Sequence, residues 1–159
     1  MQIPLQPLSR RLLLAGAAVF AWRSSQAAPV TLPTPVSLPD ELEQALKKGS
    51  PLLVLVSLEG CPFCRVAREN YLGPMRDQQG LDVVQVDMRS SRTIKGFKGE
   101  TLTQDELIRG WRIKVAPSVL FFGRGGVEVA ERLVGGYIPD FYGAYLDDRL
   151  RLARAALRS

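Results

Sequence analysis

The sequence predicts one α/β domain built around a mixed β-sheet that is flanked by helices. Three observations support this prediction. Residues 51–58 are apolar at almost every position, as expected for a central strand covered on both faces. Segments with helical apolar stripes separate this strand from the second strand, and the second strand from the third, which favours parallel crossovers. The last two strands are separated only by the glycine-rich residues 123–126, which favours an antiparallel hairpin.

The first 27 residues are typical of an export signal. Ser9, Arg10 and Arg11 precede an apolar stretch of about eleven residues, shorter than the ~20 residues that a membrane-spanning helix needs. Small residues follow, and we expect cleavage after Ala27. The arginine pair resembles a twin-arginine translocation signal, and a general secretory signal is the alternative. An uncleaved segment, with Trp22 at the interface, would instead be a membrane anchor.

Cleavage leaves about 132 residues, which is enough for a single core. We expect a proline-rich leader over 28–37 and the domain over 38–159. The signal carries three of the 21 basic residues and none of the 16 acidic ones, so the net charge falls from +5 to +2. No compact basic stripe with interleaved aromatic residues stands out, and nucleic-acid binding is not expected. The predicted location is the periplasm, with no membrane span once the signal is removed.

The elements follow in the order αβαβαββα. Ser37 caps a first helix that ends near Gly49, with Leu38, Leu42, Ala45 and Leu46 on its inner face. The strand over 51–58 leads into a helix that begins at Cys61. We expect that helix to end at Gly73–Pro74, because proline cannot continue it. A second strand covers residues 81–88.

The second half begins with residues 89–98, which are polar and predict an exposed insertion rather than core. Thr103 and Glu106 have the spacing of a capping box and open a short helix that reaches Trp111. Strands are expected over 118–122 and 127–134. A last helix covers 139–157, with four residues predicted to face inward: Phe141, Ala144, Tyr145 and Leu152.

The two cysteines, Cys61 and Cys64, lie three residues apart directly after the apolar strand. A strand that delivers Cys61 to the first turn of a helix places its sulfur near unpaired backbone N–H groups, which favour the thiolate. A thiolate is the attacking species in disulfide exchange. Cys64, one turn later, is placed to attack a mixed disulfide, and Pro62 suits the first helical position because it needs no N–H there.

Three other interpretations of the pair stay open. A structural disulfide across so short a loop contributes little through chain entropy. A zinc site needs four cysteine or histidine ligands, whereas the sequence holds two cysteines and no histidine, so no metal is expected. The third is a pair of buried cysteines that act as small apolar residues, which the intervening Pro62 disfavours.

Three motifs in this order resemble the thioredoxin superfamily over residues 38–157. They are the dithiol motif 61–64 after a buried strand, Val115-Ala116-Pro117-Ser118 before the hairpin, and Gly135-Gly136 after it. The resemblance implies that Pro117 has a cis peptide bond and faces the dithiol, and that the backbone of Ala116 pairs with an extended substrate. An ordinary trans-proline that begins an edge strand is the alternative.

Within the superfamily the chain resembles exported bacterial thioredoxins of the SoxW-like kind. It combines an export signal, the polar insertion after Asp87 and the sequence Val134-Gly135-Gly136-Tyr137-Ile138-Pro139-Asp140-Phe141 that leads into the last helix. Gly135-Gly136 followed by Asp140 also resembles glutaredoxins, which bind glutathione near that turn, although a simple tight turn explains these glycines equally well. Gly60 stands where thioredoxins usually have tryptophan, so substrate packing beside Cys61 should differ.

Leu55 stands where thioredoxins often bury an acid that assists proton transfer, so that role cannot be transferred. Glu59 is the nearest acid in the sequence, and it is either a proton-transfer group at the rim of the site or a solvated loop carboxylate. Phe63 adds neither charge nor hydrogen bond between the cysteines, so we expect no extreme oxidant.

The sequence therefore predicts an exported thiol–disulfide oxidoreductase. Cys61 attacks, Cys64 resolves, and Pro117 shapes the docking groove, where Ala116, Phe63 and Gly60 contact the substrate. The expected substrates are disulfide-containing exported proteins, reduced with electrons from a membrane donor and without a bound cofactor. The alternatives are a glutathione-dependent enzyme and a thioredoxin-like binding module, such as a Cu(I) carrier that uses the two soft thiolates.

Overall fold

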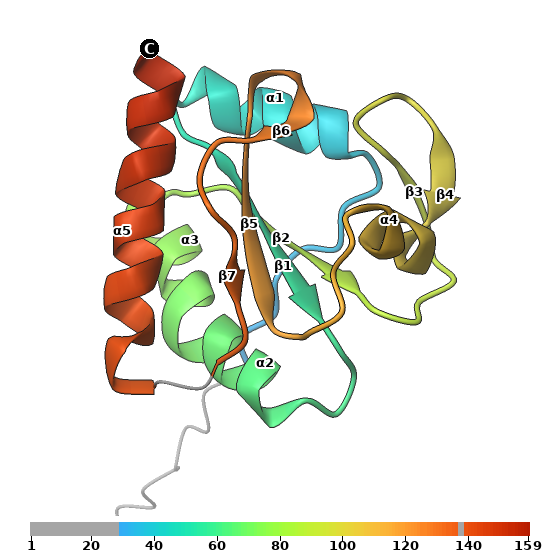
Figure 1. Ribbon diagram of the computed structural model, residues 1–159, viewed down its shortest axis with the longest axis horizontal. Coiled ribbons are helices and arrows are strands. Elements are labelled where there is room, and N and C mark those ends of the chain that lie inside the picture. The colour runs from blue at the N-terminus through green and yellow to red at the C-terminus, as the bar shows by residue number, and fades with distance from the viewer. Residues whose placement is uncertain (1–28, 137–138) are drawn as a thin grey trace, which may run out of the picture.

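The computed structural model describes residues 29–136 and 139–159 (Figure 1). The predicted signal, residues 1–27, lies outside the described residues. The elements in chain order are α1 (Leu38–Lys47), β1 (Leu52–Ser57), α2 (Pro62–Val66), the π-helical segment η1 (Ala67–Leu72), α3 (Gly73–Gln79), β2 (Val83–Asp87), β3 (Thr93–Lys95), β4 (Thr101–Thr103), α4 (Gln104–Gly110), β5 (Ser118–Gly123), the 3₁₀ turn η2 (Arg124–Gly126), β6 (Val127–Glu128), β7 (Leu133–Val134) and α5 (Pro139–Arg158).

The central sheet is mixed, as predicted, and its strand order is β2-β1-β5-β6, with β7 also paired to β5. β1 and β2 are parallel, with Leu53 opposite Val83, and β1 and β5 are antiparallel, with Val56 opposite Ser118. Every residue of β1 and β5 is buried, which explains why the sequence of β1 is apolar without alternation. No helix among the described residues is long and apolar enough to cross a membrane.

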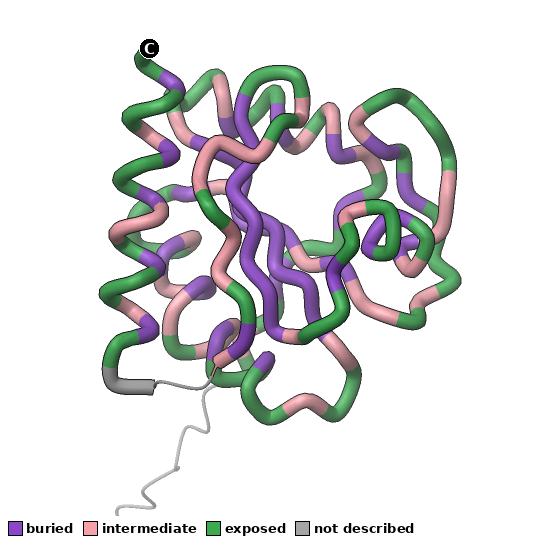
Figure 2. Tube along the Cα trace, viewed as in Figure 1, coloured by how far each residue is buried: buried purple, intermediate pink, exposed green. Residues whose placement is uncertain are grey.

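Two hydrophobic clusters lie on opposite faces of the sheet, because successive side chains of a strand point to opposite faces. Leu53 and Leu55 of β1 belong to the cluster covered by η1, α3 and α5. Leu52, Val54 and Val56 belong to the cluster covered by α1 and α4. Figure 1 shows α5 and α3 on one side of the sheet and α4 on the other, and Figure 2 shows the buried strands between them.

The leader is extended, and it packs on the domain along the free edge of β2. The N–H of Gln85 donates to the carbonyl of Pro33 (2.8 Å), and the N–H of Lys95 donates to the carbonyl of Val36 (2.9 Å). Leu32 is buried in the cluster beneath α5. The first hydrogen bond covers part of the edge of β2, which would otherwise leave backbone groups unpaired, and the second joins the leader to β3.

The helical stretch that follows Cys61 does not end at Gly73–Pro74, and that prediction was wrong. It changes to π-helical hydrogen bonding over η1 and then continues as α3, which ends at Gly80 with φ +67°. The Gly73 N–H donates to the carbonyl of Arg68, and Pro74 follows at the start of the new α-helical register. Proline has no N–H to donate, and the residues of the first helical turn need none because they have no acceptor within the helix. A side chain at Gly73 would overlap Val30 of the leader.

The insertion after β2 is more ordered than its polar sequence predicted. β3 and β4 form a small antiparallel hairpin, with Ile94 opposite Leu102. Ile94 is 1% exposed and belongs to the cluster beneath α1 and α4, so the prediction of an exposed insertion was wrong at this residue. The capping box of α4 is present as predicted: Thr103 accepts from the N–H of Glu106, and the Glu106 carboxylate accepts from the N–H of Thr103.

The segment after β5 and the last helix depart from prediction in detail. The expected strand over 127–134 is two short strands, β6 and β7, both of which pair with β5. The last helix covers the predicted range, but its inner face is different. The residues expected inside are exposed, and the buried stripe is Tyr142, Leu146, Leu150, Ala153 and Leu157. α5 carries two apolar stripes with helical spacing, and the sequence alone does not say which one meets the sheet.

Candidate active site

Cys61 lies at the end of a turn that continues directly from the central strand. β1 ends at Ser57, and the chain turns through Gly60, whose φ of +73° favours glycine. The N–H of Cys61 donates to the carbonyl of Leu58 (3.2 Å), and Cys61 then caps α2, with Pro62 in the first turn. The strand and the helix therefore fix the position of this sulfur, as the sequence predicted.

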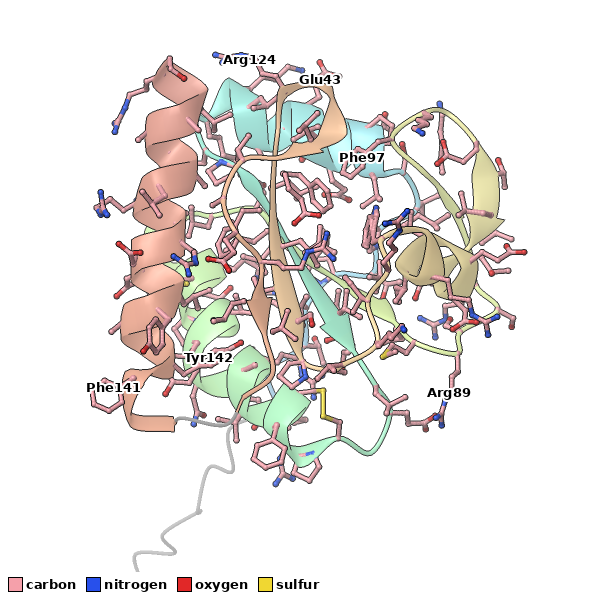
Figure 3. All side chains as sticks on the ribbon, in the orientation of Figure 1. Glu43, Arg89, Phe97, Arg124, Phe141 and Tyr142 are labelled. Atoms are coloured by element: carbon pink, nitrogen blue, oxygen red, sulfur yellow. A yellow bond between two sulfur atoms is a disulfide. The ribbon has the colours of Figure 1, made fainter. Side chains whose placement is uncertain are left out.

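The two sulfurs form a disulfide, with their Cα atoms 5.3 Å apart, and their surroundings differ (Figure 3). Cys64 is 1% exposed, whereas Cys61 is partly exposed. The backbone N–H of Cys64 donates to Sγ of Cys61 (3.1 Å). Donation to this sulfur, at the positive end of a helical stretch, favours a thiolate at Cys61 when the disulfide is reduced. A partner disulfide can reach the Cys61 sulfur, whereas the Cys64 sulfur is shielded from it.

The loop before β5 brings Pro117 to the same edge of the sheet. The Ala116–Pro117 peptide bond is cis, as the resemblance implied. Ser118 pairs with Val56 near the end of β1, so Pro117 lies beside the strand end that leads to Cys61. The hydroxyl of Ser118 donates to the carbonyl of Val115 (2.7 Å), which holds this loop in place.

The glycine pair after β7 packs against both motifs. Gly135 has φ +82° and donates its N–H to the carbonyl of Pro117 (2.7 Å). A Cβ built on Gly136 would lie 3.4 Å from Cβ of Phe63 and 3.5 Å from Cγ of Pro117. Gly135 therefore adopts a conformation that favours glycine, and Gly136 lies against the site. Phe63 itself is 54% exposed beside the dithiol. We call Phe63, Pro117 and Gly136 the neutral ridge.

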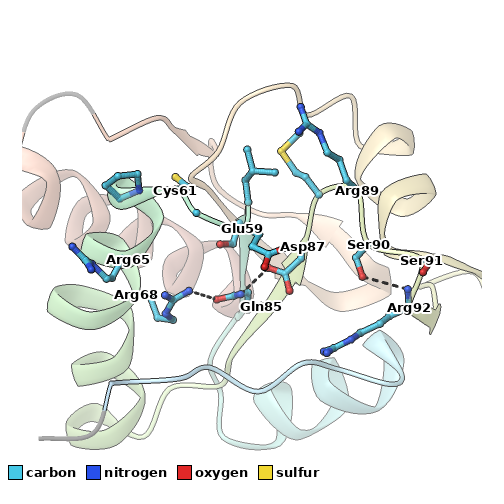
Figure 4. Close-up of a pocket in the computed structure, with 15 residues that line it drawn as sticks. Glu59, Cys61, Arg65, Arg68, Gln85, Asp87, Arg89, Ser90, Ser91 and Arg92 are labelled. Atoms are coloured by element: carbon cyan, nitrogen blue, oxygen red, sulfur yellow. Dashed lines mark hydrogen bonds between the residues drawn. The ribbon is translucent and has the colours of Figure 1, made fainter.

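A polar chain on the other side of Cys61 was not foreseen. Arg68 donates to Oε1 of Gln85 (3.1 Å), and Nε2 of Gln85 donates to Oδ1 of Asp87 (2.7 Å) (Figure 4). Gln85 lies opposite Leu55 in the parallel pair, so these polar groups stand on the strand next to the position where an acid was sought. The signal was present in β2, where Gln85 and Asp87 alternate with buried valines.

A cleft of about 1000 Å³ opens beside Cys61 and contains this polar chain. Cys61 and Gly60 form one end, and Glu59 lies exposed at its rim. Four arginines line the cleft: Arg65, Arg68, Arg89 and Arg92. Sequence reasoning treated the last two as parts of an exposed insertion and did not connect them with the cysteines, from which they are separated by 25 residues or more.

Comparison with known proteins identifies a family for this chain and finds structures that are similar to it. The family of thioredoxin-like domains matches residues 38–149. The structure of a DsbH oxidoreductase is similar at 18% identity with a TM-score of 0.53, over 81% of this chain and 93% of that one. A thioredoxin from Thermus thermophilus has 22% identity and a TM-score of 0.48, over 76% and 86% of the two chains. A poplar thioredoxin h has 20% identity and a TM-score of 0.47, over 69% and 85%. A search of curated proteins found no match.

Proposed function

The chain belongs to the family of thioredoxin-like domains, and from this premise we propose that it is an exported thiol–disulfide oxidoreductase that reduces disulfides of other exported proteins. The observation that carries the proposal is the placement of the cysteine pair. A partly exposed Cys61 and a buried Cys64 stand at the start of a helix, beside a cis-proline loop. This arrangement suits one sulfur for attack and the other for resolution.

The proposed reaction begins with both cysteines reduced. The Cys61 thiolate attacks one sulfur of a client disulfide, forms a mixed disulfide with it, and expels the second client sulfur as a thiolate that takes up a proton. Cys64 then loses its proton and attacks Sγ of Cys61. The bond from Cys61 to the client breaks, and the client leaves with two thiols. Two electrons pass to the client, and the Cys61–Cys64 disulfide remains.

Repeated turnover needs a dithiol donor that reduces this disulfide again by the same exchange. In the periplasm, which is kept oxidising, we propose a membrane protein that carries electrons from the cytoplasm. Export by the twin-arginine route and removal of residues 1–27 belong to this proposal. So does the finer subfamily, the SoxW-like exported thioredoxins. The insertion that carries β3 and β4, one of the features behind that resemblance, supports it.

The test is the reduction potential of the Cys61/Cys64 couple, measured on the chain that begins at Ala28. The protein is equilibrated in glutathione or dithiothreitol buffers, and its free thiols are then counted with mass tags. A potential near thioredoxin's roughly −270 mV supports the reductase, whereas one near roughly −120 mV reverses the proposed direction. Absence of a reversible couple overturns the enzyme and leaves a binding role, for which Cu(I) binding to the reduced dithiol is the next measurement.

A second candidate is a glutathione-dependent oxidoreductase, and one observation favours it. The Gly135–Gly136 turn contacts both Phe63 and Pro117, so a ligand bound at that turn would lie beside the dithiol. Rapid reduction of the Cys61–Cys64 disulfide by glutathione, together with no reaction with dithiol proteins, would favour this candidate over the protein-disulfide reductase.

A further inference from the structure

We propose that the arginine-lined cleft beside Cys61 is a specificity site for acidic segments of the client, so that disulfides flanked by aspartate or glutamate are preferred substrates. This inference rests on the proposed oxidoreductase function and names the class of client. The site takes carboxylate side chains that lie a few residues from the client cysteine, while that cysteine's sulfur faces Cys61.

The position of the cleft supports this assignment. Cys61, Pro62 and Gly60 line the cleft together with the arginines, so a segment bound in it is held next to the reactive sulfur. In Figure 4, Arg65 and Arg68 lie on the helical wall, and Arg89 and Arg92 come from the loop after β2 on the opposite wall. Arginines therefore stand on both walls of the cleft.

The charge of the cleft is unbalanced. Four arginines face two carboxylates, those of Glu59 and Asp87. The Asp87 carboxylate already accepts a hydrogen bond from Gln85, and the backbone N–H of Asp87 donates to Oε1 of Gln104 (2.8 Å). Over residues 29–136 and 139–159, none of the four arginines forms an ion pair, whereas Arg76, Arg109, Arg132, Arg149 and Arg151 each do. A guanidinium group that has no carboxylate partner is suited to bind one through two hydrogen bonds.

The loop that carries Arg89 is held in place before any ligand binds. Arg89 has φ +62°, an uncommon conformation for a residue other than glycine. Its N–H donates to Oδ1 of Asp105 (2.8 Å), and the N–H of Asp105 donates back to the carbonyl of Ser90 (3.2 Å). Asp105 stands in the first turn of α4, whose capping box fixes it. Conformational strain that the surroundings maintain is typical of functional loops.

The lining also distinguishes between possible anions. Among the residues that the structure describes, no aromatic side chain lines the cleft, so they offer no platform on which a nucleic-acid base could stack. Its apolar surface comes from Leu58, Pro62 and Met88, which suits contact with an extended peptide. A peptide carboxylate beside a disulfide uses both the charge of the cleft and its position next to Cys61.

The test compares two peptide disulfides that differ only at two positions flanking one cysteine, Asp and Glu in one and Asn and Gln in the other. Pre-reduced protein is mixed with each peptide in a single turnover, so no electron donor is needed, and the rate constant is read from quenched samples. We expect the acidic peptide to react about tenfold faster, a factor that corresponds to 1.4 kcal/mol. In the double variant Arg89→Gln/Arg92→Gln this ratio should fall to about two.

The matched control is Arg154→Gln/Arg158→Gln on α5, which removes the same charge outside the cleft and should keep the tenfold ratio. Equal rates for the two peptides with the wild-type protein overturn the specificity site, and they leave the oxidoreductase intact. If neither peptide is reduced, the proposed function fails instead. The cleft is then tested by titrating the oxidised protein with cysteine-free versions of both peptides, where equal affinities overturn it.

Discussion

The two sides of Cys61 differ in how they are built. On one side is the neutral ridge, where Gly135 is hydrogen-bonded to Pro117 through the backbone and Gly136 leaves no side chain over Phe63. On the other side is the cleft, where arginine side chains supply the surface. The ridge carries no charged group, whereas guanidinium groups distinguish charges. The difference suggests that the ridge accepts any extended client and that the cleft chooses among them.

The largest effect on the rate is expected from replacing the cysteines, which lie between the neutral ridge and the cleft. Cys61→Ser should lower the single-turnover rate on both peptides by on the order of 10³ or more, because the attacking sulfur is lost. Cys64→Ser should still attack and should accumulate a mixed disulfide, because the resolving sulfur is absent. Mass spectrometry of the quenched reaction checks this. If Cys61→Ser formed the adduct in place of Cys64→Ser, the assigned roles would be reversed.

The next effect comes from filling the ridge. Gly136→Leu places a side chain against Phe63 and Pro117, so it should slow both peptides about tenfold or more by displacing the client backbone. Gly136→Ala, whose Cβ stands at ordinary contact distances, should cause a smaller loss in the same assay. The ratio of the acidic to the neutral rate should be the same in both variants. A change in that ratio alone would show that the ridge also selects by charge.

A smaller effect comes from the support of the cleft. Thr103→Ala removes the side-chain cap of α4 and should lower the free energy of unfolding by about 1 kcal/mol, measured by urea denaturation. Loosening the first turn that holds Asp105 should also reduce the preference for the acidic peptide by about twofold. Thr101→Ala, on the exposed end of β4, is the control. If Thr103→Ala were destabilised but kept the full preference for the acidic peptide, the cap of α4 would not contribute to the specificity of the cleft.

The capping box of α4 also predicts that the free energy of unfolding depends on pH. Hydrogen bonds from the backbone and the hydroxyl of Thr103 hold the pKa of Glu106 below its ordinary value of 4.5. A lowered pKa in the folded state means that this contribution is complete above pH 4.5 and is lost as the pH falls through the folded value. The difference in unfolding free energy between wild type and Glu106→Gln should therefore shrink below pH 4.5. A difference that grew on acidification would contradict the assignment.

Local patterns in the sequence were enough to predict the strand before Cys61, the capping box at Thr103 and the cis bond at Pro117. Each depends on a few neighbouring residues or on a recurring motif. The inner face of α5 was not predictable in this way, because Tyr142 and Tyr145 both belong to apolar stripes and only packing against the sheet distinguishes them. The continuation past Pro74 depends on the change of register in η1, for which the sequence carries no simple signal.

The cleft shows a further limit of sequence reasoning. Arg65 and Arg68 belong to the helical stretch after Cys61, and Arg89 and Arg92 to the loop after β2, so they meet only because β1 and β2 are parallel neighbours that end at the same edge. The overall charge of the chain does not reveal these arginines either. Residues 28–159 carry a net charge of only +2, and this small excess gives no indication of four arginines in a cleft beside one cysteine.

The last predicted effect is that of salt, and it distinguishes the ridge from the cleft without any mutation. Raising the ionic strength from about 0.01 M to 0.1 M shortens the screening length from about 30 Å to 10 Å. The rate for the acidic peptide should then fall about threefold, because its carboxylates are drawn to partly exposed guanidinium groups. The neutral peptide has no carboxylate beside its cysteine, and its rate should change far less. In Arg89→Gln/Arg92→Gln, which keeps Arg65 and Arg68 in the cleft, the difference between the salt responses of the two peptides should shrink to less than twofold. An undiminished salt response in this variant would place the charge selection elsewhere on the surface.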